Sequence, residues 1–139
     1  MTEDSIADFR SDTLTKPDAA MRQAMAEAEV GDDVFGEDPT IHQLEAEAAS
    51  FLGQEAALFV PSGTMANQIA IHGHCQSGDE LICEERSHVF LYEAGAVARW
   101  SSTQCRTFAS TSGFGTPDLI KPLLREDDPH QPRSRLMVI

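Results

Sequence analysis

Five apolar residues that run straight into a turn of small residues constrain the fold of this chain more than any other feature. The apolar run is Ala56–Val60, the turn is Pro61–Thr64, and a helical pattern continues from Met65. This order predicts a strand, a turn and a helix start, an arrangement that leads the chain of α/β proteins to the ligand crevice at the carboxyl ends of their strands. The first free N–H groups of such a helix point at the crevice, so a phosphate is the expected ligand.

The residues of the turn suit a phosphate, but they also suit a simpler role. Gly63 admits a close approach of the backbone, and the hydroxyl groups of Ser62 and Thr64 can each donate a hydrogen bond to an anionic oxygen. The alternative is an ordinary helix start in which Ser62 or Thr64 caps the first turn. The turn alone leaves both interpretations open.

Strand and helix patterns alternate along the rest of the sequence. The expected strands are Ala56–Val60, Glu80–Cys83, Gln104–Phe108 and Arg135–Ile139, and the expected helices are Pro17–Glu29, Thr40–Leu52, a stretch from the turn to about Gln76, Ser87–Ala94 and Thr116–Leu124. Asp38 is expected to cap the second helix and Gly53 to end it, whereas Pro122 should shorten the last one. The alternation predicts an α/β fold with a mostly parallel sheet flanked by helices.

Charge and composition exclude several classes of protein. The formal net charge is −13 and only ten residues are Lys or Arg, so a general nucleic-acid surface is not expected. No apolar run approaches the roughly 18 residues of a membrane helix, and the polar start Met1–Asp4 does not resemble a signal peptide. Cys75, Cys83 and Cys105 are an odd, sparse set that suits packing in a reducing compartment. We therefore expect a cytoplasmic protein that binds neither nucleic acid nor membrane.

Two groups of residues invite a metal interpretation that their spacing does not support. His72, His74 and Cys75 lie close together with Cys83 nearby, but positions 72 and 74 of a helix point to opposite sides, and the spacing matches no closed zinc pattern. The acidic segment Gly31–Pro39 does not follow the calcium-loop pattern either. We expect no metal site and a loop at Gly31–Pro39.

Four segments, taken together, resemble one family in order and spacing. They are Phe9–Thr13 (FRSDT), Val30–Thr40 (VGDDVFGEDPT), Pro61–Asn67 (PSGTMAN) and His88–Gly95 (HVFLYEAG). They are similar to the N-terminal part of the low-specificity threonine aldolases, which belong to the aromatic amino acid β-eliminating lyases, pyridoxal phosphate (PLP) enzymes with the aspartate-aminotransferase-like fold (fold type I). The resemblance implies an N-terminal arm over residues 1–15 and an incomplete, truncated PLP-binding large domain over residues 16–139.

The resemblance implies a cofactor-binding role for the turn and for one histidine. Gly63 and Thr64 would bind the phosphate of PLP, with Ser62 as a neighbour in the same cup. His88 would stack on the pyridine ring of the cofactor and is a candidate for proton transfer. A stacked imidazole suits both tasks, because it can restrain a flat ring and move protons near neutral pH.

Substrate and subunit contacts are also implied by the resemblance. Ser11 would help to hold the carboxylate of a small amino-acid substrate, and Tyr92 would lie beside the substrate pocket. On residue type alone, Ser11 could instead cap a turn with Asp12, and Tyr92 could pack against His88, which lies one helical turn earlier. The loop around Phe35 would approach a partner subunit in a homodimer or homotetramer.

The activity implied is PLP-dependent aldol cleavage of β-hydroxy amino acids such as L-threonine and L-allo-threonine to glycine and an aldehyde. The family's Schiff-base lysine lies beyond Ile139, and neither Lys16 nor Lys121 matches it, so a chain ending here would be an inactive N-terminal fragment. One alternative is another β-eliminating lyase or an aminotransferase of the same fold. A second alternative is a non-catalytic, degenerate half-domain.

Overall fold

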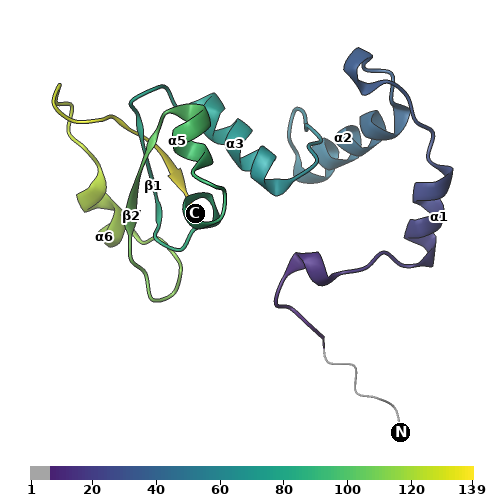
Figure 1. The fold of residues 1–139 in the computed structure, drawn as a ribbon, viewed down its shortest axis with the longest axis horizontal. Coiled ribbons are helices and arrows are strands. Elements are labelled where there is room, and N and C mark those ends of the chain that lie inside the picture. The colour runs from purple at the N-terminus through teal and green to yellow at the C-terminus, as the bar shows by residue number, and fades with distance from the viewer. Residues whose placement is uncertain (1–6) are drawn as a thin grey trace, which may run out of the picture. The chain divides into compact units, whose positions relative to one another are not determined.

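The computed structural model describes residues 7–139. Residues 1–6, which include the polar start and the first part of the predicted arm, lie outside the described residues. The chain forms two compact units, Met1–Phe59 and Val60–Ile139, coloured purple to blue and teal to yellow in Figure 1. The predicted division between an arm and a large domain at residue 15 stays a prediction.

The described part of the first unit, from residue 7 on, holds two helices and two short 3-10 turns. These are η1 (Asp12–Leu14), α1 (Ala19–Glu27), η2 (Asp33–Phe35) and α2 (Pro39–Leu52). The predicted ends of α2 are confirmed, because the Ile41 N–H donates to the Asp38 carboxylate over 2.9 Å and Gly53 adopts the left-handed conformation with φ 64°. Local capping chemistry therefore accounts for both ends of this helix.

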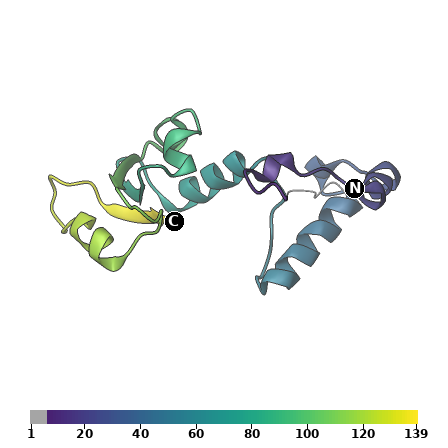
Figure 2. The ribbon, with the colours of Figure 1, turned by 90° about the horizontal axis from the view of Figure 1, so that it is seen from below.

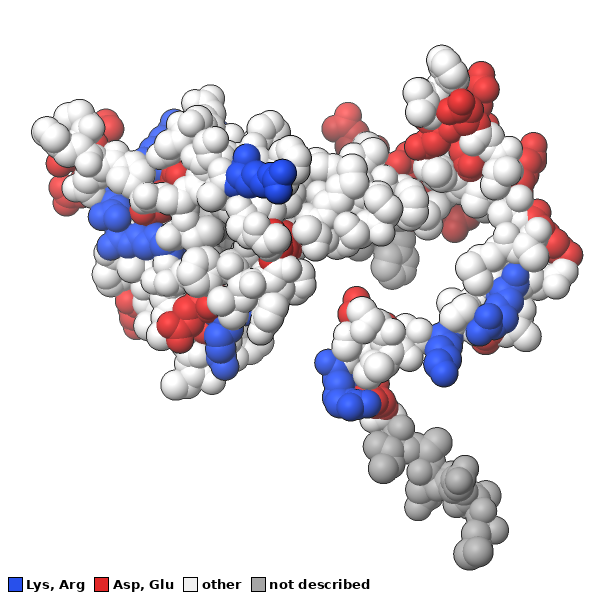
Figure 3. All heavy atoms as spheres, viewed as in Figure 1, with Lys and Arg blue, Asp and Glu red and all other residues white. Residues whose placement is uncertain are grey.

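The acidic loop before α2 is closed on itself by side-chain hydrogen bonds. The buried carboxylate of Asp38 accepts from the Gly31 N–H over 3.1 Å, and the Thr40 hydroxyl donates to the Glu29 carbonyl over 2.6 Å. In Figure 3, red acidic side chains gather over the part of the first unit that holds this loop. The predicted loop is confirmed as a segment with little regular structure but with defined contacts.

Gly31→Ala should open this loop. A Cβ atom at position 31 would lie 2.1 Å from the Glu37 carbonyl oxygen, and relieving such a backbone clash costs about 1–3 kcal/mol. We expect hydrogen exchange at the Ile41 amide to accelerate roughly tenfold or more.

The matched control for this substitution is Gly73→Ala. A Cβ atom at position 73 meets nothing within 4 Å, and alanine is favoured over glycine in a helix by about 0.5–1 kcal/mol. Exchange in the last turn of its helix should therefore slow. Unchanged exchange at Ile41 in Gly31→Ala would show that the loop is not closed as described.

The second unit alternates helices and strands. Its elements are α3 (Gly63–His74), β1 (Glu80–Glu84), α4 (His88–Leu91), α5 (Ala96–Ser101), β2 (Gln104–Phe108), α6 (Pro117–Ile120), η3 (Lys121–Leu123) and β3 (Ser134–Val138). Both strand pairs are parallel and the strand order is β2-β1-β3. The predicted α/β architecture with a parallel sheet is confirmed.

Helices cover both faces of this small sheet. The core on one face consists of Ile71, Cys75, Leu81, Cys83, Val89 and Val97, with Cys105, Leu136 and Val138 packed against it. Figures 1 and 2 show α5 on one side of the sheet and α6 on the other. Cys75 and Cys83 are buried, which confirms the packing role expected for the cysteines at these two positions, and burial raises the pKa of the Cys75 thiol. No helix within residues 7–139 has the length and apolar character needed to cross a membrane.

A buried carboxylate ties the amino end of β1 to its neighbours. Glu80 is only 1% exposed, and it accepts hydrogen bonds from Gln104 Nε2 over 2.6 Å and from Arg125 Nε and Nη2 over 3.2 Å each. Arg106 Nη1 lies 3.8 Å from the same carboxylate. These contacts join β1, β2 and the segment before β3 at the amino ends of the strands.

Three expectations for local structure need correction or refinement. Ala56–Val60 is not a strand in the described chain. Its apolar composition suits a strand, but no neighbouring strand forms hydrogen bonds with it. The last strand is only half-buried, since it pairs with β1 along one edge and Met137 is 45% exposed. The helix expected over Ser87–Ala94 is shorter, because it ends at Leu91, and a separate helix begins at Ala96 after Gly95 at φ 69°. Pro122 shortens the final helix as predicted.

Candidate functional site

The amino end of α3 presents two free backbone donors. The Ser62 hydroxyl accepts from the Met65 N–H and the Ser62 carbonyl accepts from the Ala66 N–H, both over 3.1 Å. Within residues 7–139, the N–H groups of Gly63 and Thr64 have no partner. Ser62 therefore caps the helix, while two donors remain for an anion at the positive end of a 12-residue helix dipole.

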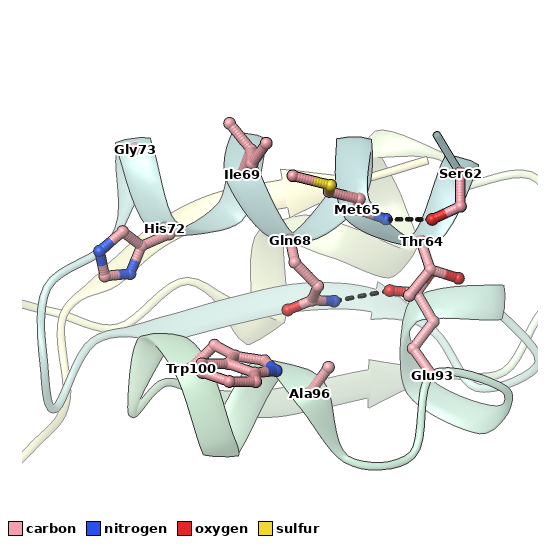
Figure 4. A pocket seen from close by; sticks show the side chains of 10 residues that line it. All are labelled: Ser62, Thr64, Met65, Gln68, Ile69, His72, Gly73, Glu93, Ala96 and Trp100. Carbon is pink, nitrogen blue, oxygen red and sulfur yellow. Dashed lines mark hydrogen bonds between the residues drawn. The ribbon is translucent and has the colours of Figure 1, made fainter. Parts of the chain in front are cut away.

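A buried glutamate after α4 connects this helix to the predicted histidine. The Glu93 side chain has no exposed surface. Its Oε1 accepts from Asn67 Nδ2 over 2.7 Å and lies 2.8 Å from His88 Nδ1, and its Oε2 accepts from Gln68 Nε2 over 2.6 Å. Figure 4 shows the Gln68 amide reaching from α3 to this carboxylate. The charged group is thus held by two side chains of α3 and one of α4.

Glu93 remains ionised in this environment. Burial, the largest single influence, favours the neutral acid, but the hydrogen bonds from Asn67, Gln68 and His88 together outweigh it and hold the pKa of Glu93 below its usual range. An ionised carboxylate can only accept hydrogen bonds. The proton shared with His88 therefore belongs to the imidazole.

The rings of His88 and Tyr92 lie against each other at the surface of the second unit. Their centroids are 5.7 Å apart and their planes are inclined by 50°. The His88 side chain is 61% exposed and Tyr92 is 69% exposed. The helical spacing predicted this proximity, whereas the binding roles of both residues stay predictions.

A groove of about 750 Å³ runs between α3 and α5. It is lined by Ser62, Thr64, Met65, Gln68, Ile69, His72, Gly73, Glu93, Ala96 and Trp100. Figure 4 shows Ser62, Thr64 and Glu93 at one end and His72 and Trp100 toward the other. The groove therefore has a polar end at the start of α3 and a more apolar remainder.

Ser11 belongs to the first compact unit, where it caps a 3-10 turn. Its hydroxyl accepts from the Thr13 N–H over 3.2 Å and lies 3.3 Å from an Asp12 carboxylate oxygen. This arrangement matches the turn-capping alternative weighed from the sequence. The substrate-binding role of Ser11 stays a prediction, as does the subunit contact of Phe35, whose side chain is 76% exposed.

The residues present fit the phosphate and ring of PLP. Two free N–H groups, the nearby Thr64 hydroxyl and a helix amino end are the donor set that a phosphate dianion requires. An atom added at the Cα of Gly63 would meet nothing within 4 Å, so the backbone there is accessible to a ligand. The exposed face of the His88 ring can stack on a flat aromatic group. Within residues 7–139, no cluster of three or more metal-ligating side chains is present.

Sequence reasoning missed the polar side chains that link these parts. Asn67 and Gln68 follow the turn by one helical turn, and Glu93 follows His88 by five residues. A single acidic residue in the otherwise apolar stretch after His88 was the one available signal, since a buried charge needs partners. The pairing itself spans 26 residues between Asn67 and Glu93, and no local pattern encodes it.

Comparisons with known proteins point to one family. The family model for β-eliminating lyases matches residues 8–139. The low specificity L-threonine aldolase of Escherichia coli K12 is 43% identical over 131 residues, which are 94% of this chain and 39% of that protein. The low specificity L-threonine aldolase of Saccharomyces cerevisiae is 47% identical over 123 residues, 87% of this chain and 32% of that protein. The chain thus spans roughly a third of the length of these relatives.

Solved structures agree on the fold. A Listeria monocytogenes protein assigned as an L-allo-threonine aldolase superposes with a TM-score of 0.60 at 23% identity, over 81% of this chain and 33% of that one. An Exiguobacterium protein assigned as an aromatic amino acid β-eliminating lyase/threonine aldolase gives a TM-score of 0.57, also at 23% identity, over 76% of this chain and 31% of that one. The α/β fold of the described chain is therefore that of the corresponding part of fold type I lyases.

Proposed function

We propose a function for this chain from one premise: it belongs to the β-eliminating lyase family. In this proposal it is the cofactor-anchoring part of a PLP-dependent carbon–carbon lyase. The reaction is the aldol cleavage of β-hydroxy amino acids of the L-threonine and L-allo-threonine type to glycine and an aldehyde. The observation that carries the proposal is the pair of free N–H groups at Gly63 and Thr64 in the same unit as the His88–Glu93 pair.

The chain's own residues would hold the cofactor by its two ends. The N–H groups of Gly63 and Thr64 and the Thr64 hydroxyl would bind the phosphate, with Ser62 keeping the first turn of α3 in place. The His88 ring would stack on the pyridine ring. When bound, PLP supplies an electron sink for the electrons left at Cα as the Cα–Cβ bond breaks.

His88 is the residue that we propose transfers protons in this reaction. An imidazole can take the proton of the β-hydroxyl group and release it again near neutral pH. Tyr92, whose ring lies 5.7 Å from that of His88, would border the substrate, and Ser11 would help to bind the substrate carboxylate. Assembly as a cytoplasmic homodimer or homotetramer belongs to the same proposal.

Thr64→Val should weaken the binding of the PLP phosphate. Valine keeps the shape of threonine but removes the hydroxyl donor, and a hydrogen bond to a charged group is worth about 1.5–3 kcal/mol. We expect the Kd for PLP to rise about tenfold to a hundredfold, measured by fluorescence titration of protein expressed from the complete reading frame. The control is Thr111→Val on an exposed loop, which should leave the Kd unchanged. Equal Kd values for both variants would remove Thr64 from the phosphate site.

Product analysis tests the proposed reaction. The protein from the complete reading frame, loaded with PLP and given L-threonine, should release glycine and acetaldehyde in equal amounts. Release of ammonia and a 2-oxo acid would indicate β-elimination instead. Amino-group transfer to an added 2-oxo acid would indicate an aminotransferase, and an absence of turnover over a panel of β-hydroxy amino acids would contradict the proposal.

A further inference from the structure

The hydrogen bonds around Glu93 determine which nitrogen of His88 carries a proton. His88 Nδ1 lies 2.8 Å from Glu93 Oε1, and the ionised carboxylate cannot donate. Nδ1 must therefore carry the hydrogen. Within residues 7–139, the other ring nitrogen, Nε2, has no hydrogen-bond partner, and the side chain is 61% exposed.

Two hydrogen bonds from α3 fix the orientation of the Glu93 carboxylate independently of His88. Asn67 and Gln68 are successive residues of α3, and each donates to a different oxygen of Glu93, over 2.7 Å and 2.6 Å. Both amide groups are half-buried, so water competes poorly for these bonds. Rotation of the Glu93 side chain would break two hydrogen bonds in a buried site, which is costly. The orientation of the acid is thus set by the helix whose amino end offers the anion site.

We propose that Glu93 is a positioning residue that fixes His88 as the Nδ1–H tautomer and leaves Nε2 as the free basic nitrogen of the ring. The hydrogen bond made by one imidazole nitrogen decides the protonation of the other. Without such a partner, neutral histidine in water prefers the opposite tautomer, with the hydrogen on Nε2. The catalytic consequence rests on the proposed function: Nε2 would be the atom that takes the β-hydroxyl proton, while Glu93 stays ionised beside the imidazolium that results.

A purely structural role for Glu93 is the competing explanation. Bonds from Asn67 and Gln68 already join α3 to the residues after α4, and they would do so whatever the state of His88. Such a role predicts a loss of stability when Glu93 is changed. It predicts neither a defined tautomer nor a selective loss of turnover, so these two properties separate the explanations.

Nitrogen NMR of the histidine rings tests the tautomer directly. Protein from the complete reading frame, labelled with ¹⁵N in its histidines, is examined by long-range ¹H–¹⁵N correlation at a pH where the rings are neutral, without and with PLP. His88→Asn identifies the His88 signals. We expect a protonated Nδ1 and an unprotonated Nε2 at His88, and a protonated Nε2 at exposed His72. A protonated Nε2 at His88 without PLP would overturn the proposal, and this result does not depend on any enzymatic activity.

Variants of Glu93 supply the second test. In Glu93→Gln the amide of the new side chain is itself a donor, so His88 should become a mixture of tautomers and kcat for aldol cleavage should fall about tenfold to a hundredfold with little change in KM. Glu93→Asp should restore part of the turnover. The control Glu85→Gln removes an equal charge from an exposed site and should change neither property.

The outcomes separate this inference from the proposed reaction. A wild-type protein that lacks aldolase activity but has Nδ1–H at His88 would refute the reaction and support the positioning role. Full turnover and an unchanged tautomer in Glu93→Gln would refute the positioning role alone. If Glu93→Gln does not fold, the wild-type spectrum still decides the question.

Discussion

His88→Asn should lower kcat for aldol cleavage by about 10²- to 10⁴-fold, the usual contribution of a general acid–base group. Asparagine retains an amide that can donate to Glu93, so the buried carboxylate keeps a partner. It has no nitrogen that can take up and release a proton near neutral pH. The expected loss is therefore in turnover rather than in folding, and the far-ultraviolet circular dichroism spectrum should remain unchanged.

The matched control for His88 is His130→Asn. The side chain of His130 is 90% exposed in the loop before β3, far along the chain from the residues of the candidate site. Steady-state kinetics of both variants with L-threonine, in protein from the complete reading frame, provide the comparison. A kcat for His88→Asn within twofold of the control would exclude His88 from proton transfer.

Arg125→Met should destabilise the second unit, Val60–Ile139, by about 3 kcal/mol, which is the lower part of the range for breaking a buried ion pair. The variant leaves the carboxylate of Glu80, which is 1% exposed, without two of its hydrogen bonds. Gln104 still donates to it over 2.6 Å, so the loss should not reach the upper part of the range. Urea unfolding followed by tryptophan fluorescence measures the effect.

Removing both charges should restore much of this stability. In the double variant Glu80→Met and Arg125→Met the buried carboxylate is absent, and apolar side chains of similar volume commonly replace a buried pair at little cost. Arg133→Met, at an exposed position, is the single-charge control and should change the free energy of unfolding by less than about 0.5 kcal/mol. A double variant as unstable as Arg125→Met would contradict this account of Glu80.

Elements with their own local signals were predictable from the sequence. Asp38 and Gly53 mark the ends of α2, because a capping carboxylate and a left-handed glycine act within a few residues. The alternation of strands and helices likewise predicted a parallel sheet. Features that depend on distant partners were not predictable. The apolar run Ala56–Val60 has strand composition, but a strand also requires a neighbour, and none pairs with it in the described chain.

The same distinction applies to the candidate site. The turn and helix start at Ser62–Thr64 could be predicted because they consist of consecutive residues, whereas the role of the turn as an anion site stays a prediction. The proximity of His88 and Tyr92 followed from a separation of one helical turn. Glu93 could not be assigned, because its role depends on side chains of α3 that are 25 and 26 residues away. Tertiary contacts, rather than motif spacing, give that residue its chemistry.

A crystal structure of the PLP-loaded protein, expressed from the complete reading frame, tests the central claim most directly. The account predicts that the phosphate accepts hydrogen bonds from the backbone N–H groups of Gly63 and Thr64. It also predicts that the His88 ring stacks on the pyridine ring while its Nδ1 stays bonded to Glu93. A phosphate bound away from the amino end of α3, or a His88 ring turned away from the cofactor, would contradict the account.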